Sequence, residues 1–221
     1  MPDAVFFDLD GTLIDTAPDF YTVINATLHE AGRPPVTFSA VREQVSNGGK
    51  AMIGLGFGLK PGDTEFDHWL NRFLDRYEQH LAVDTVLFDG MAEVLNQLDQ
   101  HNIPWGIVTN KPTRFTLPVL QGLNLIDRIG PIICPDDVSV RKPDPEGLLI
   151  AAKQTHSKPE KCIYVGDHIR DIAAGRNARM TTIAALFGYI DATENPQDWH
   201  ADHYIEHASE LPALFELSKR L

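Results

Sequence analysis

The stretch that decides the fold lies near the N-terminus and reads Val5-Phe6-Phe7-Asp8-Leu9-Asp10-Gly11-Thr12-Leu13. Its bulky apolar start, with high β-propensity, predicts a buried strand over residues 5–7. A buried strand cannot solvate a carboxylate, so Asp8 and Asp10 are expected in the loop where the strand ends. Residues two apart on a strand point the same way, so both carboxylates face one pocket if strand geometry persists that far. Crowded carboxylates repel unless a cation lies between them, and oxygen-only ligands of high charge favour Mg²⁺.

Composition restricts the class of protein. The chain has 221 residues, 43% of them hydrophobic, which suits one large domain or a domain with a smaller insertion. The apolar runs are too short to cross a bilayer, and the N-terminus lacks a basic region followed by an apolar one. Cys134 and Cys162 both lie in apolar runs and are interpreted as buried thiols. We therefore expect a cytoplasmic protein.

The charge balance bears on partners. A formal net charge of −12 argues against nucleic acid and anionic membranes, because phosphate backbones demand basic patches. It also argues against a highly anionic substrate, unless a metal is present or positive charge is concentrated locally. Two such concentrations exist, at residues 110–114 and 141–143. The expected partner is a small molecule, and the chain itself is expected to be a monomer or homodimer.

Apolar strands alternate with amphipathic helices after residue 86. The expected strands are 103–108, 132–134, 162–165, 181–186 and 204–205; the expected helices are 91–100, 113–122, 145–155, 169–178 and 209–219. This alternation indicates an α/β fold with a Rossmann-like, doubly wound parallel sheet covered on both faces. Right-handed crossovers bring the carboxyl ends of the strands to one edge, where ligands bind.

Only helical patterns occur between the first strand and residue 86. Helices are expected over 15–31, over 40–46 with Ser39 as N-cap, over 50–55 and over 64–81, while residues 46–50 form a helix-breaking loop rich in donors. The predicted organisation is therefore a core of residues 1–15 and 86–221, with residues 16–85 inserted as an all-helical cap. The cap is expected to lie beside the carboxylate edge as a lid.

Polar residues follow four of the predicted strands. They are Asp8 and Asp10 after the first, Thr109 and Asn110 after the second, Arg141-Lys142-Pro143 beyond the third, and Gly166-Asp167-His168-Ile169-Arg170-Asp171 after the fourth. Because all these strands end at one edge, the side chains are expected to converge. Such convergence is typical of an active site.

Phosphoryl transfer is the chemistry these residue types suit, since it depends on positioning and charge neutralisation. Asp8 is the candidate nucleophile, and Asp10 the candidate proton donor to the leaving group and base for the attacking water. The expected Mg²⁺ ligands are Asp8 and Asp167 with Asp171 in support, and Asp10 is a further candidate.

Donors for the phosphoryl oxygens are the second requirement. The Thr109 hydroxyl, the Lys142 ammonium and the backbone N–H groups near Leu9 and Asn110 are the candidates. In the predicted cap, Lys50 is a candidate partner for a substrate carboxylate, against the alternative of an exposed loop lysine.

The ordered motifs resemble those of the haloacid dehalogenase superfamily of phosphotransferases. The resemblance covers nearly the full length and rests on Asp8-Leu9-Asp10-Gly11-Thr12, Thr109, Lys142 before Pro143, and the G-D-x-x-x-D pattern at residues 166–171. It implies an aspartyl-phosphate on Asp8, with Asp10 as general acid/base and Mg²⁺ as cofactor. His168 stands where relatives often carry a small or acidic residue, and is interpreted as a neighbour of the site. Arg114 and Arg170 are left open between site and surface roles.

Within the superfamily the chain looks most like bacterial phosphoglycolate phosphatases. Residues 87–91, 105–112 and 187–190 are also similar to phosphatases of N-acetylmuramic acid 6-phosphate in peptidoglycan recycling. The resemblance therefore implies that the substrate is a small phosphomonoester, with phosphoglycolate and N-acetylmuramic acid 6-phosphate near parity and these stretches leaning slightly to the amino sugar. A sugar-phosphate mutase of the same fold and a non-enzymatic phospho-acceptor domain stay open as alternatives. A dehalogenase of the same fold also uses an Asp nucleophile but does not need a second, acid/base residue such as Asp10. The presence of Asp10 therefore favours phosphate chemistry.

Overall fold

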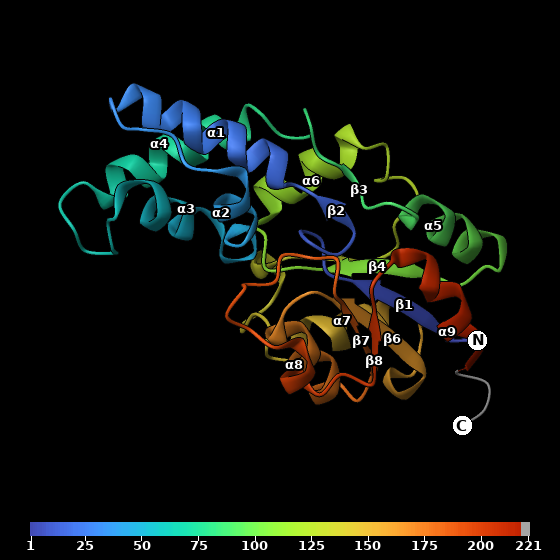
Figure 1. The fold of residues 1–221 in the computed structure, drawn as a ribbon. Helices are drawn as coiled ribbons and strands as arrows, with labels where there is room; N and C mark the ends of the chain where they lie inside the picture. Colours follow the sequence, from blue (N-terminus) through green and yellow to red (C-terminus); the bar gives the residue numbers. More distant parts are fainter. Residues whose placement is uncertain (218–221) are drawn as a thin grey trace.

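The computed structural model describes residues 1–217 and is built on a six-stranded sheet (Figure 1). Across the sheet the strands are β5 (Ile132–Ile133), β4 (Trp105–Val108), β1 (Ala4–Phe7), β6 (Cys162–Gly166), β7 (Thr181–Ala185) and β8 (His203–Ile205). Every pairing in this sheet is parallel. The predicted doubly wound α/β fold is confirmed, and its first strand lies at the centre.

Helices cover both faces of the sheet. They are α5 (Met91–Gln100), α6 (Thr113–Gly122), α7 (Glu146–Gln154), α8 (Ile169–Asn177) and α9 (Leu211–Leu217). The alternation along β1 decides the packing: Val5 and Phe7 enter the apolar cluster of α5, α6 and α9, whereas Ala4 and Phe6 enter that of α7 and α8. The closing helix was expected to reach Lys219, which lies outside the described residues.

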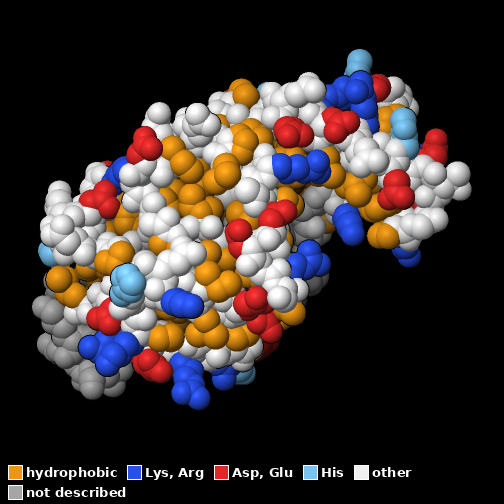
Figure 2. Space-filling model, turned by 180° about the vertical axis from the view of Figure 1, so that it is seen from behind, with side chains coloured by type: hydrophobic (Ala, Val, Ile, Leu, Met, Phe, Trp, Pro, Cys, Tyr) orange, Lys and Arg blue, Asp and Glu red, His pale blue; other side chains and the backbone are white. Residues whose placement is uncertain are grey.

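The helical insertion consists of α1 (Ala17–Glu30), α2 (Phe38–Arg42), α3 (Gly48–Phe57) and α4 (Phe66–Glu78). It has an apolar cluster largely of its own, in which Phe20 of α1 packs on Phe73 and Tyr77 of α4. Figure 1 shows it as a lobe beside the sheet. Over the face in Figure 2, acidic and basic side chains are interspersed.

A short ribbon carries the chain into and out of the insertion. Strands β2 (Ile14–Asp15) and β3 (Val86–Leu87) pair antiparallel, Ile14 with Leu87 and Asp15 with Val86. The expectation that Asp15 begins a helix is therefore wrong, because α1 begins at Ala17 after Thr16. Strands of two residues are too short to show a hydrophobic period, so this ribbon was not predicted.

Two further expectations about the insertion are wrong. The N-cap of α2 is Thr37, whose extended backbone lets its hydroxyl accept from the Ala40 N–H at 3.3 Å, while Ser39 lies inside the helix. The loop expected at residues 46–50 is instead the end of a 3₁₀ turn, η1 (Val45–Asn47), and the first turn of α3. Gly48, at φ +70°, makes the junction.

Both cysteines are free and buried, as predicted. Within residues 1–217, no helix combines the length and apolar character needed to span a bilayer.

Candidate active site

The chain turns sharply directly after β1. The Leu9 carbonyl accepts from the N–H groups of Leu13 and Ile14, both at 3.0 Å, and Gly11 has a φ of +87°. A Cβ at Gly11 would also lie 2.1 Å from Oδ2 of Asp167, so only glycine fits here. Strand geometry therefore does not persist to Asp10, and Asp8 and Asp10 enter different networks.

Three buried carboxylates form the first network. Single oxygens of Asp8, Asp167 and Asp171 lie within 4.8 Å of one another. Asp8 follows β1, Asp167 follows β6, and Asp171 lies in the first turn of α8. The predicted convergence of strand ends thus brings these three side chains together.

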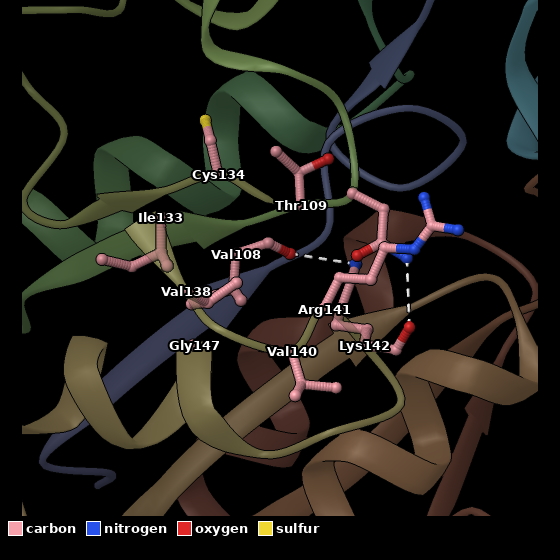
Figure 3. A pocket seen from close by; sticks show the side chains of 10 residues that line it. Val108, Thr109, Ile133, Cys134, Val138, Val140, Arg141, Lys142 and Gly147 are labelled. Atoms are coloured by element: carbon pink, nitrogen blue, oxygen red, sulfur yellow. Dashed lines mark hydrogen bonds between the residues drawn. The ribbon is translucent and has the colours of Figure 1, made fainter. Parts of the chain in front are cut away.

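Lys142 lies among these carboxylates. Its ammonium is 2.8 Å from Oδ1 of Asp8 and 2.7 Å from Oδ1 of Asp171. It also donates to the Val108 carbonyl at 3.0 Å, as Figure 3 shows, and to the Tyr164 hydroxyl at 2.9 Å. A lysine beyond β5 is therefore fixed across the ends of β4 and β6.

The three carboxylates differ in their pKa values because their surroundings differ. Burial raises the pKa of Asp8, but Lys142, Arg170 and the Leu9 N–H outweigh it, so the pKa lies below the ordinary value. For Asp167, burial and the charges of Asp8 and Asp171 raise the pKa to about 7, against hydrogen bonds from the Tyr189 N–H and the Thr12 hydroxyl. For Asp171, burial raises the pKa although Lys142 opposes it.

The donor set fits a hard divalent cation. It is oxygen-only and buried, and Lys142 supplies a single positive charge against three carboxylates. Such sets suit Mg²⁺, which binds a few carboxylates and keeps positions for water and phosphate oxygens.

Asp10 belongs to a second network. Its Oδ1 and Oδ2 lie 3.0 and 3.2 Å from the Lys111 ammonium, and Oδ1 accepts from the Thr16 hydroxyl at 2.8 Å. The same ammonium donates to the hydroxyl of Tyr77, on α4 of the insertion, at 2.8 Å. Asp10 is not brought into the three-carboxylate cluster, where it had been a candidate ligand. Lys111 had been noted only as local positive charge.

Thr109 and Asn110 follow β4, as expected. Thr109 is buried, and its hydroxyl accepts from the Lys111 N–H at 3.1 Å. Asn110 donates through Nδ2 to the Lys142 carbonyl at 3.2 Å, and its buried Oδ1 has no hydrogen-bond partner within residues 1–217. Figure 3 shows Thr109, Arg141 and Lys142 gathered at this end of the strand.

The insertion reaches the site through Ser46. The Ser46 hydroxyl donates to Oδ2 of Asp167 at 3.5 Å, and its carbonyl accepts from Nη2 of Arg170. Lys50, the residue expected to face the substrate, is exposed on α3. Arg114 is also exposed and lies over the Phe115 ring. Of the two arginines left open, Arg170 is the one placed at the site.

His168 is the N-cap of α8. Its Nδ1 accepts from the Arg170 N–H at 3.2 Å, and its ring stacks near Trp199. Burial lowers the pKa of His168 to about 4, so the ring is neutral at pH 7. It lies beside the carboxylate cluster and is not part of it.

The segment after β7 contains a residue that the sequence did not reveal. The Tyr189 N–H donates to Asp167 at 2.8 Å, while its hydroxyl donates to Asp15 at 2.6 Å and accepts from the N–H groups of Thr16 and Ala17. Arg42 of the insertion lies over the Tyr189 ring. Tyr189 thus joins the carboxylate cluster to the start of the insertion.

The class of protein is defined by three features together: a parallel α/β sheet whose central strand is followed by the buried Asp8, a helical insertion beside the sheet, and carboxylates around a buried lysine. Residues 5–185 match the family described as haloacid dehalogenase-like hydrolase, so the chain belongs to this family. The curated relatives are phosphatases, and the chain is an enzyme of that class.

Two relatives and one solved structure illustrate what the chain is similar to. An N-acetylmuramic acid 6-phosphate phosphatase of Pseudomonas putida is 44% identical over 213 residues, covering 96% of each chain. A phosphoglycolate phosphatase of Xanthomonas campestris pv. campestris is 40% identical over 210 residues, covering 95% of each. A crystal structure of a predicted phosphoglycolate phosphatase from Haemophilus somnus has a TM-score of 0.85 at 22% identity, covering 96% of this chain and 97% of that one, which shows the shared fold.

Proposed function

We propose that the protein is a Mg²⁺-dependent phosphomonoester hydrolase that acts through an aspartyl-phosphate on Asp8. The proposed substrate is N-acetylmuramic acid 6-phosphate, with 2-phosphoglycolate as the second candidate. The observation that carries the chemistry is the buried Asp8 carboxylate, which lies beside Lys142, Asp167 and Asp171. The order of the two substrates follows the relatives, at 44% and 43% identity for the first name and 40% for the second.

The first chemical step is assigned to Asp8. Lys142 and the Leu9 N–H both bind Oδ1, at 2.8 and 2.7 Å, so Oδ2 is the oxygen that attacks phosphorus. The new bond joins Oδ2 to phosphorus, and the bond from phosphorus to the leaving oxygen breaks. Held by Asp8, Asp167 and Asp171, Mg²⁺ would neutralise charge on the transferring phosphoryl group.

The proton transfers are assigned to Asp10. In the first step it donates a proton to the leaving oxygen, and in the second it takes one from the water that hydrolyses the aspartyl-phosphate. Lys111 and Thr16 fix its orientation through three contacts of 3.2 Å or less. Thr109, directly after β4, and Lys142, in the loop beyond β5, are proposed to bind the phosphoryl oxygens.

Residues 16–85 are proposed to be a cap domain that encloses the substrate over a core of residues 1–15 and 86–221. Contacts between the two support this, because Ser46 lies against Asp167 and Arg42 donates to the carbonyls of Phe187 and Gly188 at 2.7 and 2.8 Å. Enclosure excludes bulk water from the aspartyl-phosphate and limits substrate size.

The test is phosphate release from a panel of small phosphomonoesters with Mg²⁺. We expect release by the wild-type protein that stops in EDTA and falls at least ~1000-fold in Asp8→Asn, as is typical when a nucleophile is removed. Acid-quenched wild-type protein should carry one phosphoryl group on the peptide that contains Asp8, seen by mass spectrometry. Isomerised sugar phosphate without free phosphate would indicate a mutase, and phosphorylation without turnover would indicate a phospho-acceptor.

A further inference from the structure

The cations of the site differ in how far they are already paired. Lys142 is within 3.0 Å of two carboxylates, a carbonyl and a hydroxyl. Lys111 is paired with Asp10 and bonded to Tyr77. Arg170 has no carboxylate within ion-pair distance among residues 1–217, and its one side-chain hydrogen bond goes to the neutral carbonyl of Ser46. Arg170 is thus the site cation whose charge is left for a ligand.

The Arg170 guanidinium also has unused donors. It carries five N–H groups, and its Nε is buried without a hydrogen-bond partner in the described part of the chain. A buried donor without a partner is destabilising unless an acceptor reaches it. A bound anion would supply that acceptor.

The location of Arg170 indicates which part of a substrate its side chain would contact. It lies in the first turn of α8, next to Asp171, near enough to Asp8 to lower the pKa of that carboxyl behind the larger effects of burial and Lys142. Its side chain extends to Ser46 of the insertion. The guanidinium therefore lies between Asp8 and the insertion, where the proposed cap would enclose the leaving group.

We propose that Arg170 is a specificity-determining residue that binds a carboxylate on the leaving group of the substrate. This inference rests on the proposed function and deepens it, since both candidate substrates carry a carboxylate. Planar guanidinium groups pair with carboxylates through two parallel N–H···O bonds, which gives direction as well as attraction.

Other cations near the insertion are less suited to this role. Lys50 is exposed on α3. Arg42 already donates to the Phe187 and Gly188 carbonyls and stacks on Tyr189. Within residues 1–217, Arg170 combines an unpaired charge, a buried unused donor and a place beside Asp8.

Pairs of substrates with and without a carboxylate isolate the contribution of that carboxylate to kcat/KM. N-acetylmuramic acid 6-phosphate differs from N-acetylglucosamine 6-phosphate by the lactyl ether that bears the carboxylate, and 2-phosphoglycolate differs from 2-hydroxyethyl phosphate by a carboxylate in place of CH₂OH. For each pair we measure the ratio of kcat/KM with and without the carboxylate. This ratio does not depend on the fraction of folded enzyme, so partial misfolding of a variant cannot imitate the effect.

We expect Arg170→Gln to lower the ratio about 100-fold for the preferred pair, as a site that loses its charged partner loses discrimination. Arg170→Lys keeps the charge and should recover part of the ratio. Arg114→Gln, which removes an exposed arginine outside the site, should keep the wild-type ratio. An unchanged ratio in Arg170→Gln overturns the proposal, whether or not both rates fall, because Arg170 then serves the phosphoryl group or the insertion alone.

Binding separates this inference from the proposed function. Calorimetry with Mg²⁺ and Asp8→Asn protein measures the affinity for both members of each pair without turnover. Tighter binding of the carboxylated member that disappears in the Asp8→Asn, Arg170→Gln double variant supports the role of Arg170, even if the wild-type protein releases no phosphate and the proposed function fails. Equal affinity for both members overturns it.

Discussion

At the scale of single residues, the buried charge of Lys142 is the feature on which most of the site depends. Burial lowers the pKa of a lysine, but Asp171 and Asp8 outweigh it and the pKa of Lys142 is raised. Four partners surround its ammonium, from β1, β4, β6 and α8 or the loops after them. Lys142 therefore stays protonated, because the negative charges of Asp171 and Asp8 stabilise its ammonium.

Removing this charge should destabilise the fold as well as abolish activity. In Lys142→Met, buried carboxylates lose their counter-charge, and we expect the free energy of unfolding in EDTA at pH 7 to fall by about 3 kcal/mol. Urea unfolding measures it. Lys153→Met, at an exposed position of α7, is the control and should change stability by less than ~0.5 kcal/mol. Equal losses in the two variants would contradict this account.

The sequence revealed the types of the site residues better than their contacts. Asp8, Asp167, Asp171 and Lys142 were expected together because parallel strands end at one edge, and the structure brings them together. Lys111 escaped assignment because its partner Asp10 lies 101 residues away and turns aside after Gly11. No local pattern encodes such a contact.

At the scale of elements, segments with a clear apolar pattern were predictable and the ribbon of β2 and β3 was not. The helices of the core and all its strands except β5 have at least three residues in which such a pattern can show, whereas β2 and β3 have two each. The two-residue β5 was predicted because it lies in the apolar run at residues 132–134. The cap of α2 was misplaced because Thr37 and Ser39 both carry capping hydroxyls, and only the backbone angles distinguish them.

The first turn of α1, where the insertion begins, is bonded to residues 83–85, where the insertion ends. Asp19 is fully buried and accepts from the Asp84 N–H at 2.8 Å, the Val83 N–H at 3.3 Å and the Thr85 hydroxyl at 2.6 Å. The start of the insertion is thereby joined to its end by a single carboxylate.

Loss of that carboxylate should loosen the junction. In Asp19→Ala, a buried carboxylate that accepts three hydrogen bonds is removed, and we expect unfolding free energy to fall by about 3 kcal/mol. Asp67→Ala is the matched control, since Asp67 also lies in a first helical turn, that of α4, but is exposed. It should cost about 0.3–1 kcal/mol through the helix dipole alone. Similar costs for both would show that the bonds of Asp19 contribute little.

At the scale of the whole molecule, charge is distributed unevenly. The chain carries a net charge of −12, yet Lys111 and Lys142 are buried at the site and Arg170 lies beside them. Positive charge held inside a low-dielectric site attracts an anion more strongly than the same charge on the surface. Because Lys111 and Lys142 are paired with carboxylates, Arg170 is the cation of the site, among residues 1–217, whose charge is left to attract a small anion.

The insertion should also set a limit on substrate size. Ser46 lies against Asp167, and Arg42 fastens α2 to the segment after β7, so a large substrate would have to displace both contacts. We expect kcat/KM for a phosphoserine protein such as casein to be at least ~100-fold below that for the preferred small phosphate. Phosphate release assays on both measure this. Comparable values would show that the insertion does not enclose the site.

The ribbon of β2 and β3 has a consequence for how such enzymes diversify. Because Ile14 and Leu87 face each other across two antiparallel strands, the polypeptide leaves the sheet and returns to it at almost the same point, about 5 Å apart. A tight turn could reseal that gap after excision of everything between. The lobe is therefore an exchangeable cassette: another module could be spliced in at this junction to change the substrate while the machinery of the sheet stays untouched.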